Sequence, residues 1–275
     1  MKNKLAFIIT LLCLIVIIVH CFNNCSTTKT KYVPVVTLPD NYRLIFQDEF
    51  DSGILNTDVW GFHNPGKRRS AVNVEKACLL NNNGELEIRN WTEISNDDTT
   101  HYAGMIETKE NFTFGYYEAR IKFDIEMGSW GAFWIMYHNF SKLYNEADNP
   151  KEDGVEIDIV EFVPQDNGYA CHNLHWNGYN EFHKSKASGK LLNGQLTGYH
   201  TYSLLWTPEE YIFYIDGEET WSSSNAISYA PEYVILSTEI QDKGWAGSIP
   251  EKGYGTFEDT KNVMYVDYIR IFQKK

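Results

Sequence analysis

The chain has 275 residues, which is enough for one large domain with a substantial hydrophobic core. Its formal net charge of −13 argues against nucleic acid as a partner, because the phosphates would be repelled. Aromatic residues make up 15% of the sequence, and their faces stack on the apolar faces of sugar rings, although strands favour aromatics in any case.

Residues 1–25 are predicted to be a targeting segment. Lys2 and Lys4 give a positive start, and the stretch 5–19 is apolar apart from Thr10, as in a signal peptide. The apolar stretch nearly reaches the length of a membrane-spanning helix, so an uncleaved anchor is the alternative. Residues 26–40 are predicted to be a polar linker, which leaves 41–275 as the folded domain.

Two cysteines follow the targeting segment directly, as in bacterial lipoproteins. The fit of Cys21 and Cys25 is imperfect, because His20 and Asn24 stand where a lipidation signal normally has a small residue. Lipidation, plain secretion and membrane anchoring therefore stay open, and each of them places the domain outside the cytoplasm.

Cys78 and Cys171 are the only cysteines of the domain. Two cysteines make neither a disulfide framework nor a zinc site. We expect two separate buried thiols, with a single bridge as the alternative.

From Tyr42 onward, short strand-like segments are separated by turn signals, a pattern typical of an all-β sandwich. Tyr117–Ile125 alternates cleanly between apolar and charged residues. The other predicted strands are Arg43–Phe50, Ala71–Leu80, Glu85–Trp91, Tyr199–Thr207, Tyr211–Ile215 and Met264–Phe272. Turns at 81–84 and 208–210 join two pairs of them as hairpins. The sequence has no long amphipathic helix and no internal repeat.

The stretch 154–162 carries three carboxylates, Glu156, Asp158 and Glu161, among β-branched apolar residues, which favours a buried strand. Alternation places Glu156 and Asp158 on one face and Glu161 on the other. A β-bulge between Asp158 and Glu161 would return Glu161 to the first face, and bulges are common beside active sites. All three carboxylates would then line one cleft.

Clustered like charges raise one another's pKa, so at least one of these carboxyls is expected to stay protonated near neutral pH. A neutral carboxylic acid beside an ionised carboxylate is the pair that glycoside hydrolysis requires. The alternative is a strand with an acidic solvent face, but a solvated face has no reason to break its alternation.

The motif Glu156-x-Asp158-x-x-Glu161 resembles the catalytic signature of the family 16 glycoside hydrolases, in the bulged form typical of laminarinases, agarases and carrageenases. The resemblance covers residues 43–273. Its further segments are Gln47–Phe50, Gly104–Lys109, Gly115–Lys122, Trp130–Trp134, His200–Trp206, Tyr214–Gly217 and Val266–Ile271. It implies a concanavalin-type β-jelly roll of two curved antiparallel sheets with a sugar-binding cleft. It also implies Glu156 as nucleophile, Asp158 as its assistant and Glu161 as general acid/base.

The resemblance also suggests residues that bind substrate. Trp130 and Trp134 are four apart, so on a strand they face the same way and could form a stacking platform; core aromatics are the alternative. His175 and Trp176 follow the catalytic strand, and His175 is expected to tune Glu161 or bind substrate, unless it is merely structural.

The sequence also predicts substrate-binding roles for two loop residues, and a metal site. Trp245 is predicted at the cleft rim, and Arg69, in the basic run 67–69, could grip an acidic or sulfated sugar unless the run is only solvated. Relatives often carry a structural Ca²⁺, which seeks six to eight oxygens. Its predicted ligands are the side chain of Asp267 and the backbone carbonyls of Glu49 and Gly84, with a strand cap as the alternative for Asp267.

The sequence therefore predicts a monomeric, secreted or lipid-anchored bacterial endo-glycosidase that cleaves a β-linked polysaccharide with retention and without a catalytic cofactor. A β-1,3- or mixed-linkage glucan is the favoured substrate, and a galactan is possible. A non-catalytic sugar-binding module and a transglycosylase on the same fold are the alternatives.

Overall fold

The computed structural model describes residues 34–96, 98–140 and 149–275. The chain divides into two compact units, 1–34 and 35–275, and the β-sheets all belong to the second. The predicted targeting segment, with Cys21 and Cys25, lies outside the described residues. Over the residues that are described, no helix combines the length and apolar character needed to cross a membrane.

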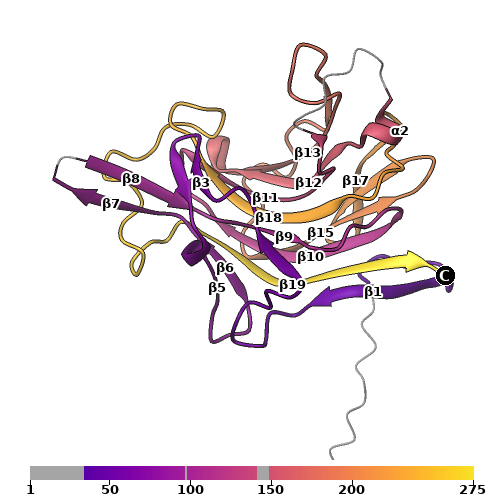
Figure 1. Cartoon of the computed structure of the whole chain (residues 1–275), viewed down its shortest axis with the longest axis horizontal. Coiled ribbons are helices and arrows are strands. Elements are labelled where there is room, and N and C mark those ends of the chain that lie inside the picture. Colours follow the sequence, from indigo (N-terminus) through magenta and orange to yellow (C-terminus); the bar gives the residue numbers. More distant parts are fainter. Residues whose placement is uncertain (1–33, 97, 141–148) are drawn as a thin grey trace, which may run out of the picture. The chain divides into compact units, whose positions relative to one another are not determined.

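The fold is built from three β-sheets, shown in Figure 1. The eight-stranded sheet has the order β17-β16-β15-β10-β19-β6-β5, with β1 also paired to β19. Its strands are β1 (Tyr42–Asp48), β5 (Cys78–Leu80), β6 (Leu86–Arg89), β10 (Gly115–Asp124), β15 (Tyr199–Trp206), β16 (Tyr211–Ile215), β17 (Glu218–Ser223) and β19 (Val263–Lys274).

The seven-stranded sheet has the order β14-β13-β12-β11-β18-β9-β2. Its strands are β2 (Trp60–Phe62), β9 (Met105–Thr108), β11 (Ser129–Met136), β12 (Glu156–Val163), β13 (Tyr169–Trp176), β14 (Lys184–Ala187) and β18 (Tyr233–Ile240). The four-stranded sheet comprises β3 (Gly66–Arg68), β4 (Ala71–Asn73), β8 (Asp98–Ala103) and β7 (Trp91–Ser95). Short helical turns are η1 (Glu75–Ala77), α2 (Pro150–Asp153) and η3 (Gln165–Asn167). The strand pairs are antiparallel except for β4 with β8.

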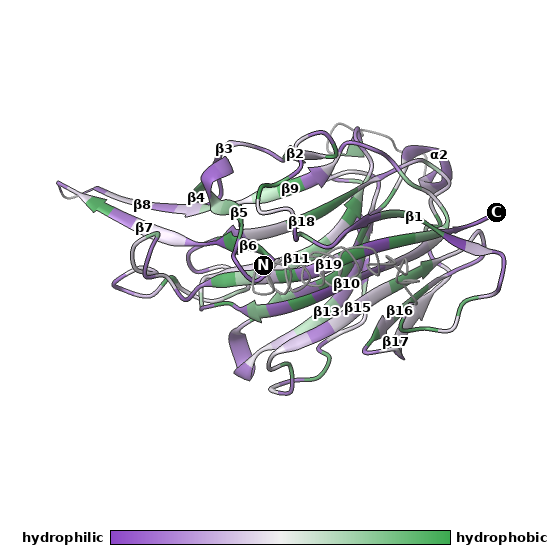
Figure 2. Ribbon diagram, turned by 90° about the horizontal axis from the view of Figure 1, so that it is seen from below, coloured by the Kyte–Doolittle hydropathy of each residue, from purple (hydrophilic) through white to green (hydrophobic). Residues whose placement is uncertain are grey.

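The main hydrophobic core lies between the eight- and seven-stranded sheets. Alternate residues of β10, such as Tyr117, Ala119 and Ile121, pack in one cluster with Ile157 and Ile159 of β12. The alternation predicted for this segment is confirmed, and Figure 2 shows hydrophobic and hydrophilic residues interleaved along the strands. The antiparallel all-β fold predicted from the sequence is likewise confirmed.

The predicted strand Ala71–Leu80 is wrong as one element. β4 belongs to the four-stranded sheet and β5 to the eight-stranded sheet, because the turn η1 carries the chain from one to the other, with Ala77 N–H donating to the Val74 carbonyl at 3.1 Å. The hairpin that follows is confirmed: β5 pairs with β6, and Gly84 has the positive φ of 75° that its turn requires. Cys78 and Cys171 are free and buried, as predicted.

Beneath the seven-stranded sheet, His172 of β13 is fully buried. One ring nitrogen lies 2.6 Å from the carbonyl oxygen of Ile159 and the other 2.8 Å from Oγ1 of Thr220, while the ring stacks on Phe213. Burial lowers the pKa of His172 from 6.5 to about 4. The folded protein therefore keeps a neutral ring at pH values where the unfolded chain takes up a proton.

We expect His172 to weaken the fold as the pH falls from about 6.5 to about 4, by up to about 3 kcal/mol. The measurement is the free energy of unfolding by denaturant at several pH values, in the wild type and in His172→Phe. The variant loses hydrogen bonds and is less stable overall, but its stability should fall less steeply over this range. Equal slopes in the two proteins would show that His172 does not titrate in this way.

Candidate active site

The three carboxylates of the motif lie on one face of β12, because the strand carries the predicted bulge. Against β13, Asp158 pairs with Asn173 and Glu161 with Cys171, so β12 uses one more residue than its partner. The register against β11 shifts at the same place. Glu156 stands opposite His175, which shares its face of β13 with Asn173 and Cys171. The bulge turns Glu161 to the side of Glu156 and Asp158.

Glu156 lies at the start of β12 and is 7% exposed. The hydroxyl of Tyr179, from the loop after β13, donates a hydrogen bond to its Oε2. Burial, and then the charge of Asp158, raise the pKa of Glu156 to about 8, while His175 and the Tyr179 hydrogen bond oppose the rise. The carboxylate form of Glu156 is thus stabilised by its two polar neighbours and destabilised by burial.

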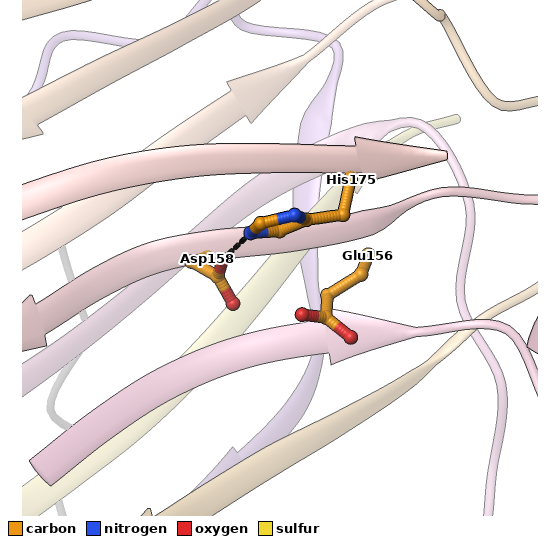
Figure 3. A group of neighbouring side chains, drawn as sticks. All are labelled: Glu156, Asp158 and His175. Carbon is orange, nitrogen blue, oxygen red and sulfur yellow. Dashed lines mark ion pairs between the residues drawn. The ribbon is translucent and has the colours of Figure 1, made fainter. Parts of the chain in front are cut away.

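Asp158 is 3% exposed and lies beside Glu156, as Figure 3 shows. Within the described part of the chain, its Oδ2 has no hydrogen-bond partner; it lies 3.4 Å from Nε2 of His175, with which it forms an ion pair when His175 is protonated. Burial, and then the charge of Glu239, raise the pKa of Asp158 to about 8. The role of Asp158 as assistant of Glu156 stays a prediction.

Glu161 is partly exposed, and Nδ2 of Asn173 donates a hydrogen bond to its Oε2 at 2.5 Å. Burial, and then the charges of Asp158 and Glu156, raise the pKa of Glu161 well above its ordinary value. A carboxyl that keeps its proton at neutral pH can serve as a general acid.

Trp130 and Trp134 share the carboxylate face of the sheet, as their spacing predicts, but they are only 4% and 5% exposed. They belong to two small clusters outside the main core. Trp134 donates its indole N–H to Oγ of Ser237 at 3.0 Å. The ring of Trp245, 40% exposed, meets Trp130 edge-on at 5.6 Å, and the guanidinium of Arg69 lies 5.1 Å from the centre of the Trp130 ring.

Glu239, which no sequence motif predicted, binds Arg68 and Arg69 of the basic run beside this site. Arg68 donates two hydrogen bonds to the Glu239 carboxylate, at 2.9 and 3.0 Å, and Arg69 donates one at 2.5 Å. Arg69 has a left-handed backbone with φ of 52°. The charge of Glu239 also raises the pKa of Glu156 and Asp158. The only sequence signal that could have indicated Glu239 was its position as an acidic residue in the apolar strand β18.

Other residues of the site that the sequence did not predict lie on loops or depend on contacts between distant parts of the chain. Tyr179 has no motif around it. His63 follows β2, and its Nδ1 lies 2.5 Å from Oε2 of Glu107 while its ring packs edge-on against Trp134 and tilted against Tyr233. No periodic pattern in the sequence links these positions.

The structure does not bring Trp176 to the site. Its neighbour His175 faces the carboxylates, so Trp176 points to the opposite side of β13 and packs against the main core. The prediction for this residue followed its position next to His175 and overlooked the alternation of the strand.

Two residues of the predicted Ca²⁺ site have side chains that pair with arginines. The carboxylate of Asp267 accepts a hydrogen bond from Arg120 at 2.7 Å, and that of Glu49 forms two hydrogen bonds with Arg270, at 2.9 and 2.7 Å. Gly84 offers only its backbone. Arg120 engages one oxygen of the one predicted side-chain ligand, and the calcium site stays a prediction.

Comparisons with known proteins agree with this geometry. The sequence profile of the glycosyl hydrolases family 16 matches residues 68–270. A keratan-sulfate endo-1,4-beta-galactosidase of Sphingobacterium multivorum is 24% identical over 262 residues, covering 90% of this chain and 59% of that protein. A beta-glucanase of Rhodothermus marinus is 26% identical, covering 85% of this chain and 86% of that protein.

A solved structure, described with the endo-acting O-glycanases that prominent members of the human gut microbiota express to initiate mucin breakdown, aligns with a TM-score of 0.69 and 23% identity. It covers 88% of this chain and 94% of that one, a likeness that establishes the fold. The chain spans 59%, 51% and 33% of the length of the first three curated relatives.

Proposed function

Because the chain belongs to the glycosyl hydrolases family 16, we propose that it is an endo-acting hydrolase of β-linked glycans that retains the anomeric configuration. The observation that carries the proposal is the bulge of β12, which gathers Glu156, Asp158 and Glu161 on one face. A non-catalytic sugar-binding module has no use for three clustered, mutually repelling carboxylates, because their repulsion and the burial of Glu156 and Asp158 oppose folding.

The first half of the reaction uses two of these groups. The carboxylate of Glu156 attacks the anomeric carbon as the bond to the leaving oxygen breaks, and the proton of Glu161 passes to that oxygen. Burial raises the pKa of Glu161 well above its ordinary value, which supports its role as the proton donor. Asn173, which donates to Glu161, helps to orient the acid.

In the second half, Glu161 accepts a proton from water as the water oxygen attacks the anomeric carbon and the bond to Glu156 breaks. Double displacement restores the original anomeric configuration. Asp158 and His175 act next to the nucleophile, where Nε2 of His175 lies 3.4 Å from Oδ2 of Asp158. A transglycosylase would use the same steps with a sugar hydroxyl in place of water. The bulged motif argues against one class of these enzymes, the transglycosylases that act on xyloglucan.

Trp130, Trp134 and Trp245 are proposed to bind the sugar rings beside the carboxylates. Since Trp130 and Trp134 are nearly buried, shortening either of them is expected to cost stability as well as substrate binding. The exposed ring of Trp245 offers a cleaner test.

Trp245→Ala is expected to raise KM for an oligosaccharide about tenfold and leave Tm nearly unchanged, because one stacking contact is lost and no core is opened. Tyr229→Ala is the matched control: Tyr229 is 41% exposed, against 40% for Trp245, and contacts Phe114. Its KM should equal that of the wild type. An unchanged KM in Trp245→Ala would place the substrate elsewhere.

For the substrate, we propose a β-1,3- or mixed-linkage glucan first, as one beta-glucanase relative suggests. A galactose-containing glycan is the second candidate, favoured by the keratan-sulfate galactosidase relative and by Arg68 and Arg69, which share the single carboxylate of Glu239 and leave a local positive charge for an acidic substituent.

A panel of β-glucans, galactans, keratan sulfate and mucin-type glycans, with analysis of product lengths, tests the proposal. Endo-hydrolysis predicts new reducing ends and a rapid fall in chain length on at least one polymer. Redistributed lengths without new reducing ends would indicate a transglycosylase, and binding without cleavage would indicate a sugar-binding module.

The proposed place of action is outside the cytoplasm, which rests on the apolar segment 5–19 and the cysteines that follow it. Metabolic labelling with a fatty acid, in the wild type and in Cys21→Ala and Cys25→Ala, tests lipidation. Label that persists in both single variants, or is absent from the wild type, would contradict lipidation at a single one of these cysteines.

A further inference from the structure

We propose that Glu156, Asp158 and His175 form a binding site for one divalent transition-metal ion of the Zn²⁺ type, placed so that the ion blocks the proposed nucleophile. Each residue offers one ligand atom, and these atoms all lie within 4.8 Å of one another. Figure 3 shows the ring of His175, from β13, directed at Asp158, with the carboxylate of Glu156 beside them; Glu156 and Asp158 belong to the neighbouring strand β12.

Asp158 supplies an independent argument. Asp158 is only 3% exposed, yet its Oδ2 has no hydrogen-bond partner among the described residues. A buried carboxylate oxygen without a partner is costly, and the usual remedies are a paired cation or a metal ion. The oxygen faces Nε2 of His175 at 3.4 Å, so a cation at this place contacts both groups.

His183 holds His175 in the orientation that a metal ligand needs. Nε2 of His183 lies 3.0 Å from Nδ1 of His175, and the two rings are stacked at 5.2 Å with an angle of 11°. When His175 donates its Nδ1 proton to His183, the lone pair of its Nε2 points at Asp158. Metal-bound histidines commonly use their second nitrogen for such a hydrogen bond, which fixes the tautomer.

The donor set selects the class of ion. Two carboxylates and one imidazole suit Zn²⁺, which takes three protein ligands and leaves a fourth position open. Ca²⁺ and Mg²⁺ prefer more oxygen ligands and no nitrogen. Over the described ranges 34–96, 98–140 and 149–275, this is the one group of three or more acidic, histidine or cysteine side chains with such spacing.

Metal binding follows from the geometry alone, whereas its consequence for catalysis rests on the proposed function. An ion on Glu156 withdraws the electron pair that attacks the sugar and occupies the space that the anomeric carbon would enter. We therefore expect Zn²⁺ to inhibit hydrolysis reversibly and in competition with substrate.

The test is calorimetric titration of the full-length protein, freed of metal by a chelator, with Zn²⁺. We expect the wild type to bind Zn²⁺ at this site. The Zn²⁺ affinity should be at least tenfold lower in His175→Gln and roughly tenfold lower in His183→Gln. His200→Gln is the matched control, because His200 pairs with the single carboxylate of Asp216 at 2.7 Å on the eight-stranded sheet. His200→Gln should bind Zn²⁺ with the affinity of the wild type. Titration of the wild type with Mg²⁺ should show no binding at this site.

Titration with Co²⁺ reports the ligands directly. The visible spectrum of the site should show d–d bands that His175→Gln loses, without the thiolate charge-transfer band that Cys21 or Cys25 would add. Equal Zn²⁺ affinity in the wild type and His175→Gln, or no binding at all, would overturn the proposal. An inactive protein that still binds Zn²⁺ through His175 would refute the proposed function and leave the metal site intact.

Discussion

Glu156→Gln is expected to lower turnover by at least about 10⁴-fold and to leave the fold intact, because the amide cannot attack the anomeric carbon. Glutamine keeps the shape of the side chain and its contact with Tyr179. Turnover of the best polymer from the panel, with circular dichroism to check folding, is the measurement. A folded variant with most of its activity would refute the assignment of the nucleophile.

Glu156→Gln should also change the thermal stability of the protein. The folded protein holds the pKa of Glu156 at about 8, above its ordinary value of 4.5, so ionising this group opposes folding as the pH rises between these values. The Glu156→Gln variant should therefore melt at a temperature equal to or above that of the wild type near pH 8.

Glu232→Gln is the matched control for Glu156→Gln. Glu232 is fully buried and its pKa is also raised to about 8, but it accepts hydrogen bonds from Val155 N–H and Ser228. Glutamine can still accept both bonds, so most activity should remain.

Glu161→Ala is expected to reduce hydrolysis of the natural polymer by at least about 10³-fold, since the leaving oxygen departs without a proton. The loss should be much smaller for formation of the glycosyl-enzyme from an aryl glycoside with an acidic leaving group. The basic limb of the pH profile of kcat/KM should disappear on such substrates, because it reports the deprotonation of Glu161. An equal loss on both kinds of substrate would argue that Glu161 has another role.

The central feature of the site could be predicted from the sequence because it is local. Three carboxylates lie within six residues, and Glu161 is out of phase with the other two. A β-bulge explains this spacing, and the register of β12 against β13 has such a bulge. The spacing of Trp130 and Trp134 placed them on one face for the same reason. Alternation along a strand is decided by neighbours in the sequence.

Contacts made across the fold could not be predicted in this way. Glu239 meets Arg68 over a separation of 171 residues, and Tyr179 reaches Glu156 from a loop with no periodic pattern. Trp176 was misplaced although its position was local, because its identity as an aromatic residue outweighed the alternation of β13. The break in Ala71–Leu80 depends on two sheets that the segment joins, which its own residues do not reveal.

The central claim is that Glu156 is the nucleophile and Glu161 the general acid/base of a retaining double displacement. The most direct test is the configuration at the anomeric carbon of the glycosyl azides formed when azide is added to Glu156→Ala and to Glu161→Ala with a β-aryl glycoside of the substrate. Azide in place of the nucleophile should give the α-azide in one displacement, whereas azide in place of the acid/base should attack the glycosyl-enzyme and give the β-azide. Proton NMR distinguishes the two products, and a β-azide from Glu156→Ala or an α-azide from Glu161→Ala would contradict the account.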